Sequence, residues 1–176
     1  METHDIVHQD PKSDEYNTLT RVVLLCLDED TGENVFHWSV QNFINAQTDM
    51  VVLVHVRPSE HFTTPYGNQT DYLIKLAERH RDESHVLLKK FGAILTAKKI
   101  ACKAISMHGD PQSEIVKKSQ EVKADIVIVG SHGSGLIKRT LLGSVSQYCV
   151  NHCRCSVIVA KPSRPERSPT GSDSIE

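Results

Sequence analysis

The chain has 176 residues, which is enough for one hydrophobic core, and its apolar and charged contents are those of an ordinary globular protein. A formal charge of −2 gives no electrostatic basis for broad nucleic-acid binding, which normally shows as an excess of Lys and Arg. No apolar run approaches the roughly 20 residues that cross a bilayer, and the polar N-terminus lacks the features of a signal or transit peptide. We therefore predict a cytoplasmic protein without nucleic-acid or membrane partners.

Both ends of the chain are predicted to be disordered. Residues 1–18 are polar, and residues 163–176 are rich in Pro, Ser and charged side chains with almost nothing to bury. Residues 19–162 between them form one predicted domain, since two independent cores would be cramped in a chain of this length.

Within this domain, short apolar runs alternate with amphipathic stretches. The apolar runs are rich in Val, Ile and Leu and predict buried strands at residues 21–27, 50–56, 101–107, 125–129 and 155–160. The stretches between them predict helices at residues 31–46, 71–99, from Pro111 onward, and 143–153. Two helix starts carry capping signals, which are Asp30 followed by Glu33 and Asp110 followed by Pro111.

The alternation of strands and helices predicts an α/β fold. Nearly continuous apolar strands imply a parallel sheet with helices on both faces. Right-handed crossovers make such a sheet doubly wound. Sheets of this kind bind ligands beyond the carboxyl ends of their strands, at the point where the winding direction reverses. We expect the functional site at that point.

A group of glycines and serines follows the fourth predicted strand. Gly130 comes directly after that strand, Gly133 follows three residues later, and Gly143 with Ser144 opens the last helix. Glycine admits positive φ and lets a phosphate approach the backbone, while main-chain N–H groups at such turns and helix starts attract anions. The hydroxyls of Ser144 and Ser146 can add hydrogen bonds. These residues predict a triphosphate site, although the same residue types also serve simple turns and caps.

The spacing matches neither of the two most familiar phosphate-binding motifs. No Lys follows as in G-x-x-x-x-G-K-[ST], and no G-x-G-x-x-G follows the first strand. The pattern Gly130-x₂-Gly133-x₉-Gly143-Ser144 instead resembles the motif of the ATP-binding universal stress proteins. The resemblance runs over residues 19–162 and includes LVHV at 53–56, ADIVIVGSHG at 124–133 and SVIVAKP at 156–162.

The resemblance implies a Rossmann-like, doubly wound sheet of five parallel strands in the order 3-2-1-4-5. It places Asp28 near the ribose or a metal ion, and Val56 against the adenine. It assigns the phosphates to the glycine loop and the start of the last helix, which contribute Gly130, Gly133, Gly143, Ser144, Val145 and Ser146. It further implies Mg²⁺ or Mn²⁺ on the phosphates of ATP and a homodimer through the last strand, residues 155–160.

Two histidines and an acidic turn belong to the same region. His132 lies inside the glycine loop, where its ring can hydrogen-bond a phosphate or the loop backbone. His55 lies on a strand and is expected to be a hydrogen-bonded histidine of the core or the crevice. Asp28 is followed by Glu29 and Asp30, and these two added carboxylates repel a polyphosphate unless they face solvent or hold a cation.

Four potential metal ligands lie close together near the C-terminus of the domain, namely Cys149, His152, Cys153 and Cys155. The cluster lacks the paired C-x₂₋₄-C spacing that brings two chain segments around one zinc ion. We therefore interpret these cysteines as reduced structural thiols rather than a metal site.

Three functions fit these observations. The first is an ATP-binding, nucleotide-responsive module of signalling or stress response, the second is a slow ATPase, and the third is a dimeric scaffold that binds no nucleotide. No Glu or Gln is placed by spacing to activate water at a terminal phosphate, so we expect at most weak hydrolysis.

Overall fold

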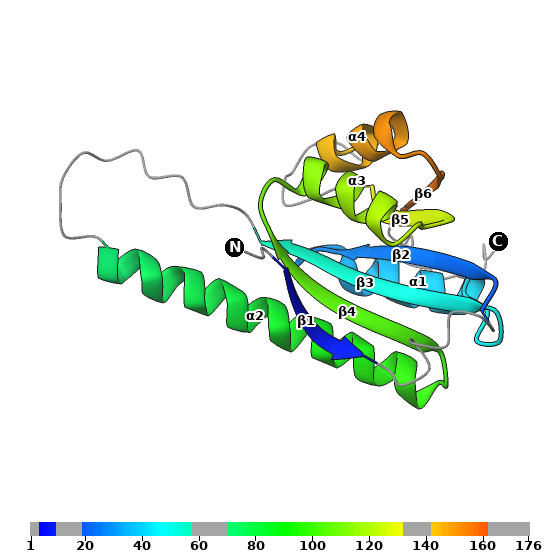
Figure 1. The fold of residues 1–176 in the computed structure, drawn as a ribbon, viewed down its shortest axis with the longest axis horizontal. Helices are drawn as coiled ribbons and strands as arrows, with labels where there is room; N and C mark the ends of the chain where they lie inside the picture. Colours follow the sequence, from blue (N-terminus) through cyan, green and yellow to red (C-terminus); the bar gives the residue numbers. More distant parts are fainter. Residues whose placement is uncertain (1–3, 10–18, 58–69, 132–141, 162–176) are drawn as a thin grey trace, which may run out of the picture.

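The computed structural model describes residues 4–9, 19–57, 70–131 and 142–161. These residues form one six-stranded sheet in the order β1-β4-β3-β2-β5-β6, with two helices on each face (Figure 1). The strands are β1 (His4–Gln9), β2 (Arg21–Leu27), β3 (Asp49–Arg57), β4 (Ala101–His108), β5 (Ile126–Gly130) and β6 (Ser156–Ala160). The helices are α1 (Gly32–Asn42), α2 (Thr70–Ala97), α3 (Pro111–Glu121) and α4 (Ser144–His152).

The five strands from β2 to β6 are parallel, and their order agrees with the predicted 3-2-1-4-5. The chain winds from β2 through β3 to β4, then returns to the other side of β2 to add β5 and β6. Winding therefore reverses between β2 and β5, whose residues Leu25 and Ile128 pair in register. The predicted doubly wound α/β fold is confirmed.

Each face of the sheet carries its own apolar core, because successive side chains of a buried strand point to opposite faces. On one face, Leu25 belongs to a cluster with Phe36 of α1 and Phe91 of α2, whose ring centroids lie 4.4 Å apart. On the other face, Leu24 belongs to a second cluster with Ile115 of α3 and with α4. The sheet is thus covered on both sides, as the apolar strands require.

The helices begin close to their predicted positions. The start of α3 is as predicted, since the carboxylate of Asp110 accepts a hydrogen bond from the backbone N–H of Ser113 and Pro111 opens the first turn. The longest helix is α2, which extends beyond the end of the sheet in Figure 1. Within the described ranges, no helix is both long enough and apolar enough to cross a membrane.

The start of α1 differs from the prediction. The N-terminal cap is Thr31 rather than Asp30, and its side chain makes no capping hydrogen bond. Glu33 binds Lys90 of α2 at 3.1 Å instead of reaching back to the cap. The carboxylate of Asp28, which precedes this turn, accepts the local N–H groups instead. The capping-box interpretation was therefore wrong, because Asp28, two residues earlier, accepts the N–H of Asp30 that Glu33 was expected to bind.

The N-terminal segment also differs from the prediction. Residues 4–9, which we expected to be disordered, form β1 and pair antiparallel with β4 at the edge of the sheet. The edge of β4 supplies backbone partners that a sequence pattern cannot reveal, and Val7 packs against the core. Only Ile6 and Val7 are apolar in β1, so its composition concealed the strand. Residues 10–18 and 163–176, also expected to be disordered, lie outside the described residues.

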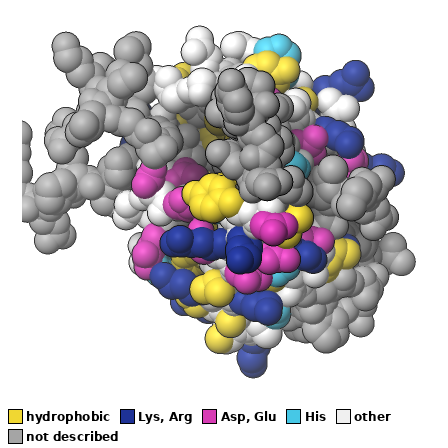
Figure 2. Space-filling view, turned by 90° about the vertical axis from the view of Figure 1, so that its left-hand side faces the viewer, with side chains coloured by type: hydrophobic (Ala, Val, Ile, Leu, Met, Phe, Trp, Pro, Cys, Tyr) yellow, Lys and Arg dark blue, Asp and Glu magenta, His cyan; other side chains and the backbone are white. Residues whose placement is uncertain are grey.

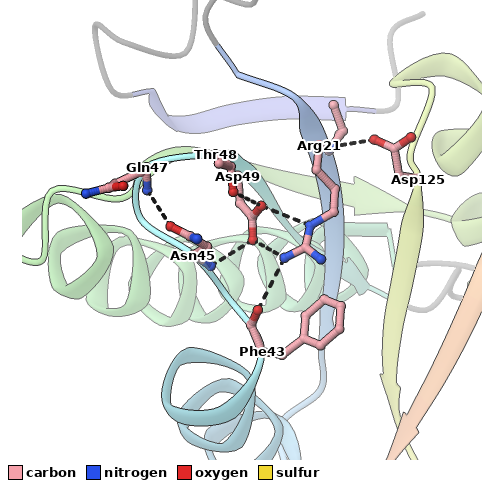
Figure 3. Close-up of polar contacts among 8 residues, drawn as sticks. Arg21, Phe43, Asn45, Gln47, Thr48, Asp49 and Asp125 are labelled. Carbon is pink, nitrogen blue, oxygen red and sulfur yellow. Dashed lines mark hydrogen bonds and ion pairs between the residues drawn. The ribbon is translucent and has the colours of Figure 1, made fainter.

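A partly buried ion pair joins Arg21 and Asp49, the first residues of β2 and β3, at the amino end of the sheet (Figure 3). Asp49 is fully buried, and its carboxylate accepts hydrogen bonds from Arg21, the backbone N–H of Asn45 and the hydroxyl of Thr48. Burial alone would raise the pKa of Asp49, but these hydrogen bonds outweigh it and hold the pKa below its ordinary value. Arg21 also donates to the carbonyl of Phe43, so the pair anchors the connection between α1 and β3.

We expect Arg21→Met to lower the free energy of unfolding by about 3 kcal/mol at pH 7, because the buried carboxylate of Asp49 loses its counter-ion. Urea unfolding followed by circular dichroism measures this loss. The depressed pKa of Asp49 means that its contribution is present above the ordinary carboxyl pKa and is lost as the pH falls through the folded value. The deficit of the variant should therefore shrink at acidic pH.

The control is Arg79→Met, which removes an exposed pair with Glu83 on α2 and should cost less than about 0.5 kcal/mol. Equal losses in the two variants would contradict a special role for the buried pair.

Candidate functional site

A cavity of about 410 Å³ lies beyond the carboxyl ends of β2, β3 and β5, beside the starts of α3 and α4. This is the place where the winding of the sheet reverses. Open α/β sheets bind their ligands at such a position, because the connections diverge there and leave a crevice between them. The location predicted for the site therefore contains a cavity.

Seven of the nine residues that the sequence assigns to a nucleotide line this cavity. They are Asp28, Val56, Gly130, Gly143, Ser144, Val145 and Ser146. The other two, His132 and Gly133, lie outside the described residues. Segments that are far apart in the sequence are thus brought to one place by the order of the strands.

Asp28 follows β2, and its carboxylate organises the turn into α1. Oδ1 accepts hydrogen bonds from the backbone N–H of Asp30, at 2.9 Å, and of Thr31, while Oδ2 accepts the hydroxyl of Thr31. A carboxylate has about four lone-pair sites, so it keeps capacity for a ligand hydroxyl or a hydrated cation. The side chains of Glu29 and Asp30 are exposed, which meets the condition under which these added carboxylates tolerate a polyphosphate.

The glycine at the end of β5 is required by packing. A Cβ on Gly130 would lie 2.4 Å from Oγ1 of Thr31 and 3.3 Å from Cγ2 of Val35, which is too close for a real side chain to fit without displacing them. Positive φ is not the reason, since among the described glycines only Gly109 has it. Gly130 therefore allows α1 to approach β5, and the residue that it admits, Thr31, is the one that binds Asp28.

The start of α4 forms the wall of the cavity next to β5. Gly143 is the N-terminal cap, and its N–H donates to the carbonyl of Ser131 at 2.7 Å, which closes the chain onto the end of β5. The hydroxyl of Ser146 donates to the carbonyl of Gly143 at 2.9 Å, so it is not the free donor that we expected. The N–H groups of the first helical turn lack intrahelical partners, and the exposed hydroxyl of Ser144 lies beside them. This wall can bind an anion.

Several residues of the cavity were not assigned to it from the sequence, and among them are Arg57, His80, Pro111 and Ile115. Pro111 and Ile115 belong to the first turns of α3, and the capping signal there could have indicated a helix start at this edge of the sheet. His80 lies at helical spacing from apolar residues, and this pattern indicates a residue that packs in the core rather than one that lines a cavity. Arg57 ends β3, and the sequence signal there is only that of a strand end.

His55 lies beside the cavity in a buried polar network. Its Nδ1 lies 2.9 Å from Oγ of Ser84, which in turn lies 2.7 Å from Oγ of Ser106, so the network joins β3, α2 and β4. Burial lowers the pKa of His55, and its ring is therefore neutral at physiological pH. This fits the expectation of a hydrogen-bonded histidine of the core or crevice.

The cysteine cluster lies at the end of α4. Burial raises the pKa of Cys149 to about 12, so its side chain is a thiol at neutral pH. The ring of His152 stacks on Tyr148, with centroids 3.9 Å apart, and its Nδ1 donates to the carbonyl of that residue. Cys153 and Cys155 are free, half-buried thiols, and no group of three potential metal ligands occurs among the described residues. Cys149 belongs to the apolar core and Cys153 and Cys155 pack against it, which fits a structural role for these thiols.

Figure 2 shows the side of the molecule toward which the carboxyl ends of the parallel strands point. Where described residues are visible, acidic and basic side chains are interspersed on this face. A mixed surface of this kind gives no long-range attraction to an extended polyanion. Specificity for a charged ligand must therefore come from the cavity itself.

Comparisons with known proteins agree with this fold. The sequence profile described as the universal stress protein family matches residues 20–161. A universal stress protein A-like protein from Arabidopsis thaliana is 24% identical over 141 residues, which cover 76% of this chain and 80% of the relative.

Two solved structures show the same architecture. The universal stress protein UspA from Lactobacillus plantarum superimposes with a TM-score of 0.68 at 20% identity, covering 80% of this chain and 97% of its own. A universal stress protein family protein from Arabidopsis thaliana, solved with AMP bound, has a TM-score of 0.63 at 22% identity and covers 85% and 97%.

The fold and the cavity define a doubly wound α/β protein with a ligand crevice at its switch point. Because the family profile covers residues 20–161, the chain belongs to the universal stress protein family. The match begins after β1, so the strand at the edge of β4 is an addition outside the matched region.

We expect Gly130→Ala to lower the free energy of unfolding by about 2 kcal/mol, because the new methyl group overlaps the hydroxyl of Thr31. Thr31→Ala alone should cost about 1 kcal/mol through the lost hydrogen bond to Asp28. In the double variant the overlapping oxygen is gone, so its total loss should be well below the sum of the two single losses. Urea unfolding of the three variants measures this, and fully additive losses would show that the overlap is not the cause.

Proposed function

We propose that this protein binds an adenine nucleotide, ATP foremost, in the cavity at the switch point and acts as a nucleotide-responsive module of signalling or stress response. The observation that carries the proposal is the gathering of seven motif residues from four separate segments around one cavity. Its volume of about 410 Å³ is within the usual range of small-molecule sites. The AMP in the Arabidopsis relative supports an adenine nucleotide as the class of ligand.

The phosphates fit the wall made by α4 in this proposal. The N–H groups of Ser144, Val145 and Ser146 belong to the first turn of the helix, where the dipole places about half a positive charge. Gly130, which also lines the cavity next to this wall, presents no side chain to the phosphates. The N–H of Gly143 already binds Ser131, so the anion takes the later donors.

The base and the ribose fit the part of the cavity beyond β3 and β2. Val54, Val56 and Ile115 supply apolar surface for an adenine ring from β3 and α3. Asp28 follows β2 and keeps acceptor capacity for a ribose hydroxyl. Since β3, β2 and β5 are neighbours, the base, ribose and phosphates lie across three strand ends in that order.

A divalent cation, Mg²⁺ or Mn²⁺, accompanies the phosphates in this proposal. Carboxylates are suitable ligands for such hard cations, and Asp28, Glu29 and Asp30 all line the cavity. Asp28 is partly engaged by the turn into α1, and the other two are exposed. The ion would therefore be held mainly by phosphate oxygens and water, with the protein contributing at most one or two oxygens.

A slow ATPase is the alternative that uses the same cavity. Hydrolysis needs a group that orients or activates water at the terminal phosphate. In the described part of the lining, the acidic residues are Asp28, Glu29 and Asp30, and the proposal assigns them to the ribose and the cation rather than to a water molecule. We therefore propose binding without efficient turnover. The other alternative is a dimeric scaffold that binds no nucleotide.

We expect calorimetry to show that the wild type binds ATP–Mg²⁺ and AMP. The affinity of Ser144→Asp for both should be lower by a factor of about ten or more. A carboxylate at the first position of α4 repels phosphates, yet it suits the positive end of the helix dipole and should not weaken the fold. Thermal unfolding without ligand verifies that the variant is as stable as the wild type.

Gln147→Glu is the matched control, since it adds the same charge on an exposed position of the same helix that does not line the cavity. If Ser144→Asp binds with the affinity of the wild type, the phosphates do not lie at this wall. No binding of millimolar nucleotide by the wild type would favour the scaffold. Single-turnover conversion of bound ATP to ADP, well above the rate in buffer, would favour the slow ATPase.

We further propose a homodimer through β6, which corresponds to residues 155–160 of the sequence prediction. β6 is the last strand of the described sheet and pairs only with β5 there. The carbonyl of Ala160 accepts from Ser131 and so faces β5. Because backbone groups alternate along a parallel strand, those of Val159 face outward and can pair with a second copy.

Val159→Pro should therefore convert the dimer to a monomer, since Pro removes an outward N–H donor. Val159→Thr keeps the N–H and the β-branched shape and should leave the dimer intact. Sedimentation equilibrium at micromolar concentrations measures both, and a dimer in the Pro variant would place the interface elsewhere.

A further inference from the structure

Arg57 is a buried cation at the edge of the cavity. It is the last residue of β3, it lines the cavity, and its side chain is only 11% exposed. Its Nε is buried and has no hydrogen-bond partner among the described residues. A buried donor without a partner costs free energy, so its presence beside a cavity points to a ligand acceptor.

The carboxylate that neutralises Arg57 comes from β1. Oδ2 of Asp5 lies 3.5 Å from Nη2 of Arg57, 2.9 Å from Nε of Arg81 and 3.4 Å from Nε2 of His85. Two guanidinium groups and an imidazole therefore share one carboxylate, and the contact with Arg57 is the longest of the three. Arg57 keeps unused donor capacity even with Asp5 in place.

The surroundings of Arg57 act on its charge in opposite directions. Burial lowers the pKa of Arg57, Asp5 counteracts this effect, and Arg81 adds to it. The guanidinium still remains charged at neutral pH. Asp5 is thus the group that makes a charged side chain tolerable at this buried position.

The position of Arg57 separates it from the phosphate wall. β2 lies between β3 and β5, so Arg57 is two strand spacings, roughly 10 Å, from Gly130. It follows Val56, against which the adenine lies in the proposed arrangement. Purine rings carry nitrogen acceptors at their edges, and a guanidinium N–H matches such an acceptor.

We infer that Arg57 donates a hydrogen bond to the nucleoside part of the bound nucleotide, and that Asp5 of β1 positions its guanidinium for this contact. The inference rests on the proposed function of the cavity. It gives β1, which lies outside the family match, a part in ligand binding. Arg57 is then a specificity-determining residue, and Asp5 is a positioning residue that acts through it.

Titration of full-length variants with adenosine, AMP and ATP–Mg²⁺ tests the contact with Arg57. We expect Arg57→Gln to weaken all three about tenfold, because the contact is with the part that they share. Arg79→Gln makes the same change of charge on an exposed face of α2 and should bind like the wild type. No loss in Arg57→Gln, or a loss that grows with the number of phosphates, would overturn the contact with the nucleoside.

A double-mutant cycle tests the positioning role of Asp5. Asp5→Asn should weaken binding about threefold, with no further loss when it is combined with Arg57→Gln. Additive losses, or tighter binding in Asp5→Asn, would overturn the positioning role, since they would show that the carboxylate acts independently or competes with the ligand. The cycle compares affinities, which a merely structural role of Asp5 would not couple to Arg57.

Arg57→Lys is the variant to use if Arg57→Gln does not fold, because it keeps the positive charge but lacks the planar guanidinium group. It should also bind adenosine more weakly than the wild type. Wild-type affinity for adenosine in Arg57→Lys would overturn the inference. A wild type that binds none of the three ligands would refute the proposed function and the inference with it. A wild type that binds them, together with an unaffected Arg57→Gln, refutes the inference alone.

Discussion

The hydrogen bonds between Thr31 and Asp28, made possible by the bare backbone of Gly130, are the constraint on which the site depends. They fix the turn after β2, and Thr31 of this turn packs on Gly130 at the end of β5; winding reverses between these two strands. A side chain at Gly130 would overlap the hydroxyl of Thr31, and an apolar residue at Thr31 would leave Oδ2 of Asp28 without that hydroxyl. Gly130, which the motif assigns to a phosphate contact, is thus also required for α1 to pack closely against β5.

The cavity that this contact keeps open has two chemically different ends. Next to β5 lie backbone N–H groups at a helix start, which carry partial positive charge without any Lys or Arg. Next to β3 lie apolar side chains of Val54 and Val56 together with the buried guanidinium of Arg57. The acidic turn after β2 separates the two ends. A ligand with an apolar ring at one end and anionic oxygens at the other matches this arrangement, and the proposed nucleotide is a ligand of this kind.

Most of the parallel sheet could be predicted from the sequence, because its strands are continuous apolar runs and α3 starts with a clear capping signal. β1 could not, since its stability comes from the edge of β4 and from ion pairs of Asp5 with distant residues. For the site, the glycine spacing and the resemblance that it carries identified the motif residues that line the cavity. The sequence did not show that the hydroxyl of Ser146 binds the carbonyl at the start of its own helix. Arg57 and His80 were missed because their approach to the cavity depends on how α2 packs.

The sheet has unlike edges, and this limits how copies of the chain can associate. On one side, β1 covers β4 with a strand whose register shifts between Ile6 and His8. Irregular edge strands are poor templates for further strands. On the other side, β6 is regular in its pairing with β5. Of the two edges of the described sheet, β6 is therefore the one better suited to strand addition, and it is the edge that the proposed dimer uses. In the proposed dimer, both outer edges would then be formed by β1, whose irregular register disfavours the addition of further strands.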